Sequence, residues 1–109
     1  MEESEFNQKV DDILAFIEDA LDNCDADLDW DLAGGILTIE CGEDSAYSGS
    51  QVIVNRQGPT QQIWVASRGG GFHFDFDANK DLWFQGELEL FSHLNQALSQ
   101  QTGETVKLC

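Results

Sequence analysis

The chain has 109 residues, of which 21 are Asp or Glu and only five are Lys or Arg, so its formal net charge at pH 7 is −16. A surface this acidic repels phosphate, which argues against a nucleic-acid-binding protein. Hydrophobic residues make up 41% of the chain, enough for a packed core, and the length predicts a single domain over residues 1–109. No apolar run approaches the ~18 residues of a membrane-spanning helix.

The start of the chain and its cysteines indicate the compartment. The residues after Met1 are acidic and lack the basic start of a secretory signal, so we expect a cytoplasmic protein that begins at its natural Met. Cys24, Cys41 and Cys109 are widely spaced and form no CxxC pair, which argues against a zinc or iron–sulfur site. We expect reduced thiols with packing roles and an exposed Cys109.

Residues 4–23 are predicted to form an amphipathic helix, because apolar residues recur there at spacings of three and four. These residues are Phe6, Val10, Ile13, Leu14, Ile17 and Leu21. Ser4 is the expected N-cap. Asp19 and Asp22 lie near the predicted C-terminus of the helix, where the helix dipole disfavours negative charge. Charges placed where they destabilise a helix are expected at functional sites.

Residues 27–32 alternate strictly between Asp and apolar side chains, which predicts a half-buried strand with a carboxylate at every outward position. Because Asp is a poor strand former, intrinsic strand propensity does not explain this pattern. One alternative is that these charges only prevent an edge strand from pairing with another molecule.

Four further strands, a short sixth strand and a second helix follow. The strands are expected at residues 36–41, 51–56, 62–66, 72–77 and about 82–84, with a turn at Gly34-Gly35. The helix is expected over residues 87–101 and ends at Gly103. This order predicts an α+β two-layer sandwich, with the N- and C-terminal helices packed on one face of a five- to six-stranded antiparallel sheet. The other sheet face would then be open to solvent.

The third and fourth predicted strands place polar residues and one Trp on that open face. If their aliphatic residues face the core, Asn55, Gln57 and Trp64 point outward. An exposed Trp beside amide side chains on a rigid sheet is typical of a protein-binding surface. The alternative is that Arg56, Arg68 or a loop covers the Trp64 ring.

The two histidines lie far in sequence from the acidic N-terminal segment. His73 alternates with Phe72 and Phe74, so it is expected on the open sheet face. His93 on the second helix is expected to be structural or exposed. The sequence therefore indicates no metal triad of two histidines and one carboxylate.

Twelve acidic residues and one basic residue, Lys9, lie in the first 31 positions, so this segment has a net charge of −11. Their mutual repulsion raises the free energy of the folded state, and cations or a basic partner are expected to offset it. Nine of these carboxylates should line up along the helix and the strand, because residues at i, i+3 and i+4 share a helix face. We call them the acidic ridge: Asp11, Asp12, Glu18, Asp19, Asp22, Asp25, Asp27, Asp29 and Asp31.

The chain resembles the frataxin family, in particular its bacterial CyaY branch, over nearly its whole length. The acidic helix and strand, the segment 34–39, the segment 70–75 and the tail 100–106 carry part of the resemblance. The most specific part is Asn-Arg-Gln-Gly-Pro-Thr-Gln-Gln-Ile-Trp-Val-Ala at residues 55–66. The resemblance implies two helices on one face of an antiparallel sheet, the same fold that the periodicity predicts.

The resemblance also implies a role in iron–sulfur cluster assembly. It implies a protein that binds iron through the acidic ridge and modulates, or supplies iron to, the complex of cysteine desulfurase and scaffold protein. We expect two partner-contacting surfaces. One comprises Glu18, Asp19 and Asp22 of the ridge, and the other comprises Asn55, Gln57 and Trp64 of the open sheet face. The chain is expected to be a monomer without iron.

The chemistry of the acidic ridge suits weak cation binding. Carboxylate oxygens are suitable ligands for Fe²⁺ and Fe³⁺. With water completing each coordination shell, we expect iron to exchange readily and Mn²⁺, Co²⁺ and Ca²⁺ to compete. Two alternatives remain for the same residues: an ordinary solvated face, or a metal-independent docking surface for a basic patch of the desulfurase. No nucleophile–base pair or closed di-metal site is visible, so enzyme activity such as ferroxidation is not expected.

Overall fold

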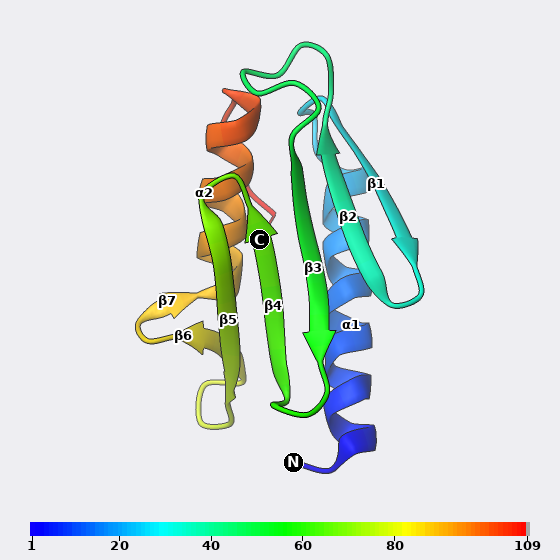
Figure 1. Cartoon of the computed structure of the whole chain (residues 1–109), viewed down its shortest axis with the longest axis vertical. Coiled ribbons are helices and arrows are strands. Elements are labelled where there is room, and N and C mark those ends of the chain that lie inside the picture. Colours follow the sequence, from blue (N-terminus) through cyan, green and yellow to red (C-terminus); the bar gives the residue numbers. More distant parts are fainter. Residues whose placement is uncertain (109) are drawn as a thin grey trace.

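The computed structural model describes residues 1–108 and shows two helices packed against an antiparallel sheet of seven strands (Figure 1). The helices are α1 (Glu3–Asp22) and α2 (Leu90–Thr102). The strands are β1 (Leu28–Ala33), β2 (Ile36–Cys41), β3 (Gln51–Gln57), β4 (Gln62–Ser67), β5 (Gly70–Asp77), β6 (Leu82–Gln85) and β7 (Leu88–Glu89). Neighbours in the sheet are also neighbours in the chain, so the strands form a meander with β1 and β7 at its edges.

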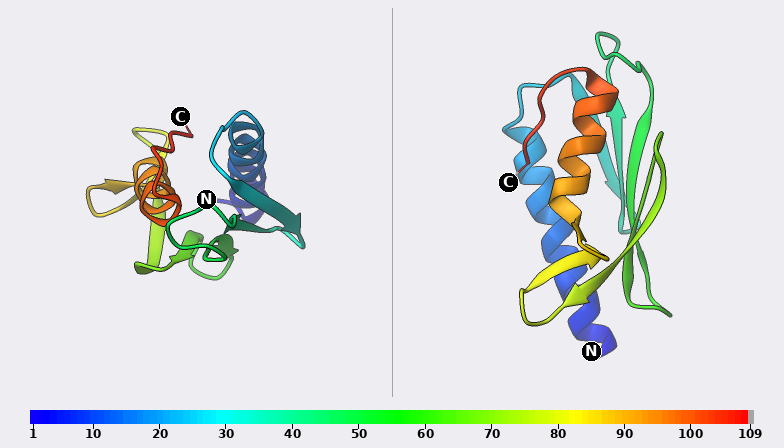
Figure 2. Two further views of the ribbon diagram at one scale, coloured as in Figure 1. Left: turned by 90° about the horizontal axis from the view of Figure 1, so that it is seen from above. Right: turned by 90° about the vertical axis from the view of Figure 1, so that its left-hand side faces the viewer.

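Both helices cover the same face of the sheet, as Figure 2 shows in side view. The predicted α+β two-layer sandwich is therefore confirmed, with more strands than the five to six that were expected. The short β6–β7 hairpin curls from the sheet toward the helix layer (Figure 2). Of residues 1–108, no helix is long and apolar enough to cross a membrane.

The helix α1 buries the apolar face that its periodicity predicts. Its buried residues are Phe6, Val10, Leu14, Ile17 and Leu21. The predicted N-cap is wrong, because Glu2 occupies the cap position and Ser4 lies inside the first turn. No side chain caps the helix at that position. Burial of the apolar face, rather than a cap, accordingly stabilises this helix.

The helix α2 begins three residues later than expected. Gly86 has a positive φ of 62°, which turns the chain from β6 into β7 instead of into a helix. The carboxylate of Glu89 then accepts hydrogen bonds from the backbone N–H groups of Phe91 (2.7 Å) and Ser92 (3.3 Å) and caps the helix. At the other end, Gly103 has a left-handed conformation with a φ of 78°, which confirms the predicted stop.

The core lies between the helix layer and the inner face of the sheet. Of the strand residues predicted to face inward, Phe72 is half-buried against the core, and the others are buried, namely Val52, Val54, Ile63, Val65 and Phe74. Within the core, the Phe6 ring meets Trp83 edge-on, with the ring centroids 6.0 Å apart. Cys41 is buried and Cys24 half-buried, and both are free thiols, while Cys109 lies outside the described residues.

Candidate functional site

Carboxylates from the middle and the C-terminal part of α1 gather around a shallow hollow beside β1. Residues lining this hollow include Asp12, Glu18, Asp19 and Asp22 from α1 and Trp30 from β1. Trp30 is half-buried because β1 alternates its side chains and turns this one toward the helices. No basic side chain lines the hollow. Four carboxylates with no counter-charge among the lining residues make this the part of the ridge best placed to attract cations.

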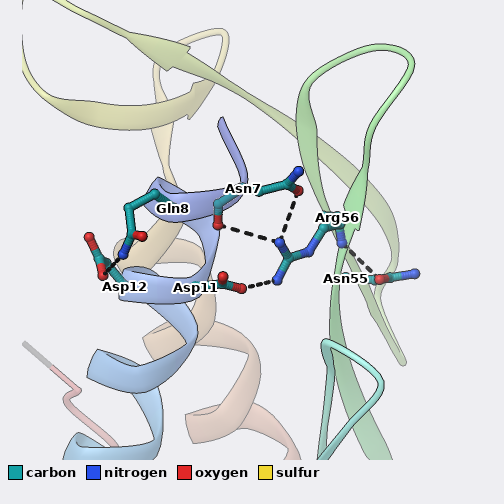
Figure 3. Close-up of polar contacts among 6 residues, drawn as sticks. All are labelled: Asn7, Gln8, Asp11, Asp12, Asn55 and Arg56. Atoms are coloured by element: carbon teal, nitrogen blue, oxygen red, sulfur yellow. Dashed lines mark hydrogen bonds and ion pairs between the residues drawn. The ribbon is translucent and has the colours of Figure 1, made fainter. Parts of the chain in front are cut away.

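Asp11 points from α1 toward the sheet, where it meets a cation from β3 (Figure 3). The Arg56 guanidinium forms an ion pair with the Asp11 carboxylate. It also donates to the side-chain and backbone oxygens of Asn7, at 3.0 and 3.4 Å. The Arg56 side chain is 21% exposed, so these contacts lie at the edge of the core. Asp11 is thus a link between helix and sheet, and its charge is partly balanced.

The carboxylates just before β1 have different surroundings. Asp25 and Asp27 are both exposed, but the Asp27 carboxylate accepts a hydrogen bond from the backbone N–H of Asp44 at 3.2 Å. That carboxylate fills the space where a side chain at Gly42 would begin, since an added Cβ would lie 2.2 Å from its Oδ2 atom. Asp27 therefore helps to hold the loop between β2 and β3.

Asp29 and Asp31 lie on β1 with their side chains on the sheet face away from the helices. The alternation of β1 dictates this, because Leu28 is buried in the core and Trp30 packs against it. Asp29 pairs in register with Glu40 of β2, which places two acidic residues side by side on the open face. Glu40 was not among the predicted site residues, although it alternates with buried Ile39 and Cys41 in the same way. The ridge therefore extends around the edge strand onto the open face.

The structure contains no preformed metal cage in its described part. Across residues 1–108, no group of three or more His, Cys, Asp or Glu side chains converges as a metal ion would require. A cation on this ridge would therefore take much of its coordination shell from water.

The open sheet face carries a second group of polar residues around Trp64. The Trp64 side chain is exposed, and its ring stacks on His73 of β5 at a centroid distance of 4.2 Å and an interplanar angle of 10°. Its indole N–H donates to Gln62 at 2.9 Å, and the Gln62 amide donates to Asp75 at 3.1 Å. These contacts hold the ring on the surface in a fixed orientation, as an anchor for a partner requires.

The predicted open-face residues lie together. Asn55 pairs in register with Trp64, and Gln57 with Gln62. Neither Arg56 nor Arg68 covers the Trp64 ring, because Arg56 reaches toward α1 and Arg68 lies over the Tyr47 ring at 3.7 Å. His73 lies on this face, as its alternation with Phe72 and Phe74 predicts, whereas its stacking on Trp64 depends on the register of β4 and β5.

His93 belongs to the core and not to either surface. It is 6% exposed, its ring lies 4.1 Å from that of Phe72, and its Nε2 atom has no hydrogen-bond partner within the described chain. Burial lowers the pKa of His93 below its ordinary value of 6.5, because the charged imidazolium would lose its solvation. The neutral ring is therefore the form that the fold favours.

Comparison with known proteins gives a consistent match over the whole chain. The model of the frataxin-like domain matches residues 1–104. The protein from Tolumonas auensis named iron-sulfur cluster assembly protein CyaY is 43% identical over 108 residues, which covers 99% of both chains. A protein of the same name from Pseudomonas aeruginosa is 44% identical over 109 residues, covering 98% of this chain and 96% of its own.

Solved structures agree with this match. The frataxin from Psychromonas ingrahamii, described within the CyaY protein family, superposes with a TM-score of 0.85 at 32% identity and covers 100% of this chain and 99% of its own. Yeast frataxin superposes with a TM-score of 0.68 at 23% identity, covering 92% of this chain and 82% of its own, which shows the shared fold alone.

Proposed function

Because the chain belongs to the frataxin family, in the branch of the bacterial CyaY proteins, we propose that it acts in iron–sulfur cluster assembly as a weak iron binder. In this proposal it modulates, or supplies iron to, the complex of cysteine desulfurase and scaffold protein. The observation that supports it best is the hollow beside α1, where four carboxylates gather without a basic neighbour. Relatives named for iron–sulfur cluster assembly support the same role.

Iron is the cargo in this proposal, and its binding is weak for a structural reason. Asp12, Glu18, Asp19 and Asp22 line an open hollow, so water remains available to complete the coordination shell. The other proposed metal ligands, Asp25, Asp29 and Asp31, are exposed, whereas Asp11 and Asp27 have protein partners. Within the hollow, the Asp12 carboxylate accepts a hydrogen bond from the Gln8 side-chain amide at 2.9 Å (Figure 3). Open oxygen ligands discriminate poorly between hard cations, so Mn²⁺, Co²⁺ and Ca²⁺ compete with iron. A carrier that must release its metal needs this exchange.

The proposed partners contact two surfaces of the molecule. Glu18, Asp19 and Asp22 steer a basic partner electrostatically and make its association salt-sensitive. Trp64 contributes a fixed aromatic anchor on the open face, flanked by Asn55 and Gln57. The acidic ridge continues onto the open sheet face through Asp29 and Asp31 of β1, and β2 separates these residues from Asn55 and Gln57 of β3.

A second candidate function uses the same surfaces without metal. In it, the chain is an acidic interaction module that regulates the desulfurase through charge alone. Two observations favour it: Asp11, Asp12 and Asp27 already contact protein groups, and residues 1–108 hold no convergent three-ligand cluster. Neither proposal assigns a catalytic residue, and both take the chain to be monomeric without iron.

An anaerobic NMR titration with Fe²⁺ tests the proposed metal site. We expect paramagnetic broadening to focus on residues around the α1 hollow, and the triple variant Glu18→Gln, Asp19→Asn, Asp22→Asn to weaken binding. The matched control is Glu43→Gln, Glu87→Gln, Glu104→Gln, which removes three exposed carboxylates outside the ridge. Broadening spread evenly over all surface carboxylates, or equal losses in the two variants, would contradict the proposed site.

A capture and activity assay with the cognate desulfurase separates the two functions. If iron matters, binding or inhibition changes when Fe²⁺ is added, and the α1 triple variant loses that response. If charge alone acts, binding falls with salt to the same extent with and without iron. Failure of the native chain to bind the desulfurase under any condition would refute both candidates.

A further inference from the structure

Phe16 is an exposed aromatic residue in the middle of the acidic surface of α1. The residue is 49% exposed, and it is not part of the buried core of the described chain. Its ring meets that of Phe91 from α2 edge-on, with centroids 5.4 Å apart at an angle of 78°. A large aromatic group held in place at the surface, among carboxylates, has the properties of an interaction anchor.

Two hollows meet at this residue. One is the acidic hollow beside β1, and Phe16 and Asp12 contribute to its lining. The other runs from α1 toward the β6–β7 hairpin and the start of α2, and the same two residues line it too. Its apolar lining consists of Ile13, Phe76, Leu82, Trp83 and Phe91. We call these two adjoining hollows, with Phe16 between them, the Phe16 groove.

The charges that line the Phe16 groove are almost all negative. Its carboxylates are Asp12, Glu18, Asp19, Asp22, Asp81 and Glu89. Lys9 is the only basic side chain in the lining, and its Nζ atom lies 3.9 Å from Asp81 and 4.7 Å from the centroid of Phe76. Lys9 is therefore occupied within the groove, which leaves an apolar floor inside an acidic rim.

We infer that the Phe16 groove docks a positively charged segment of a protein partner in which an apolar side chain lies between Lys or Arg residues. The apolar side chain packs on Phe16 and the groove floor, and the flanking cations meet the acidic rim. A second copy of this chain does not fit, because a net charge of −16 makes two such surfaces repel. The inference rests on the proposed function, since it extends the docking role of the acidic ridge around α1 to the β6–β7 hairpin.

A direct test uses the full-length chain and a short helical peptide with Lys and Arg residues flanking a central Leu-Phe pair. In low salt we expect peptide-induced NMR shifts at the groove residues. Phe16→Ala is expected to weaken binding about tenfold, because it removes the central anchor. Phe16→Leu keeps apolar area and should retain most of the affinity. Tyr47→Ala removes a similarly exposed aromatic ring outside the groove and should change nothing.

Each outcome of this test is decisive for the groove. Equal binding by the native chain and by Phe16→Ala, or no binding by the native chain, would overturn the inference. So would equal affinity for a peptide with Ser in place of the Leu-Phe pair, because charge alone would then explain binding. An unchanged NMR fingerprint outside the groove confirms that Phe16→Ala is folded.

Desulfurase capture then separates this inference from the proposed function. If Phe16→Ala weakens capture as the α1 charge variants do, both ideas are supported. If only the charge variants weaken it, the desulfurase role stands and the groove is not part of that contact. If the native chain captures no desulfurase but binds the peptide through Phe16, the proposed function fails and the groove retains its basic partner.

Discussion

The end of α1 offers a measurable test of strain in the acidic ridge. The helix ends at Asp22, and its last turn contains no basic residue. Asp19 and Asp22 lie where the backbone carbonyls already give the helix a partial negative charge. We predict that the double variant Asp19→Asn, Asp22→Asn unfolds less readily than the native chain. The Asn23 side chain, which donates to the Asp19 backbone oxygen at 2.9 Å, is unaffected.

The size of the gain follows from the two positions. An unfavourable charge near a helix terminus costs about 0.3–1 kcal/mol, so removing both should add about 0.6–2 kcal/mol to the free energy of unfolding. For a chain of this size, 1 kcal/mol raises the melting temperature by about 4 °C. We therefore expect a rise of about 2–8 °C at low ionic strength, less at high salt because the repulsion is then screened.

Urea unfolding followed by far-UV circular dichroism measures this gain. The control is Glu87→Gln, Glu104→Gln, which makes the same change in net charge at exposed positions away from α1. If both variants gain equally, total charge and not the helix end explains the effect. A native chain as stable as the Asp19→Asn, Asp22→Asn variant at low salt would refute the argument that the ridge is strained.

Three further predictions concern stability. Arg56→Met should lower the free energy of unfolding by about 1–2 kcal/mol, because it breaks contacts with Asn7 and Asp11. The control Arg68→Met should leave α1 unaffected, and thermal melts of both variants check this. Because the pKa of His93 is lowered in the fold, stability should fall as the pH drops below 6.5. His93→Leu should reduce that loss between about pH 7.5 and pH 5.5, and equal urea midpoint shifts in both proteins would contradict it. Millimolar Ca²⁺ should raise the melting temperature of the native chain more than that of the α1 triple variant, as scanning calorimetry would show.

The local pattern of the sequence predicted most of the fold. The spacing of apolar residues in α1 and the alternation in β3 and β4 identified the buried faces, because a side chain's direction depends on its own element. The two-residue strand β7 was missed, since a segment so short has no measurable period. The start of α2 was also predicted too early. It depends on the positive φ of Gly86 and on the cap by Glu89, and the spacing of apolar residues reports neither.

The sequence alone determined that carboxylates would crowd α1 and β1, and that Trp64 would face away from the core. Only the tertiary structure decided which of those groups are free to bind. Arg56 reaches Asp11 across 45 positions of the chain, and Phe91 supports Phe16 from the other helix. Periodicity reports the face of one element and carries no information on what a distant element places against it. The charge was therefore visible in the sequence, but its division into engaged and open carboxylates depended on packing.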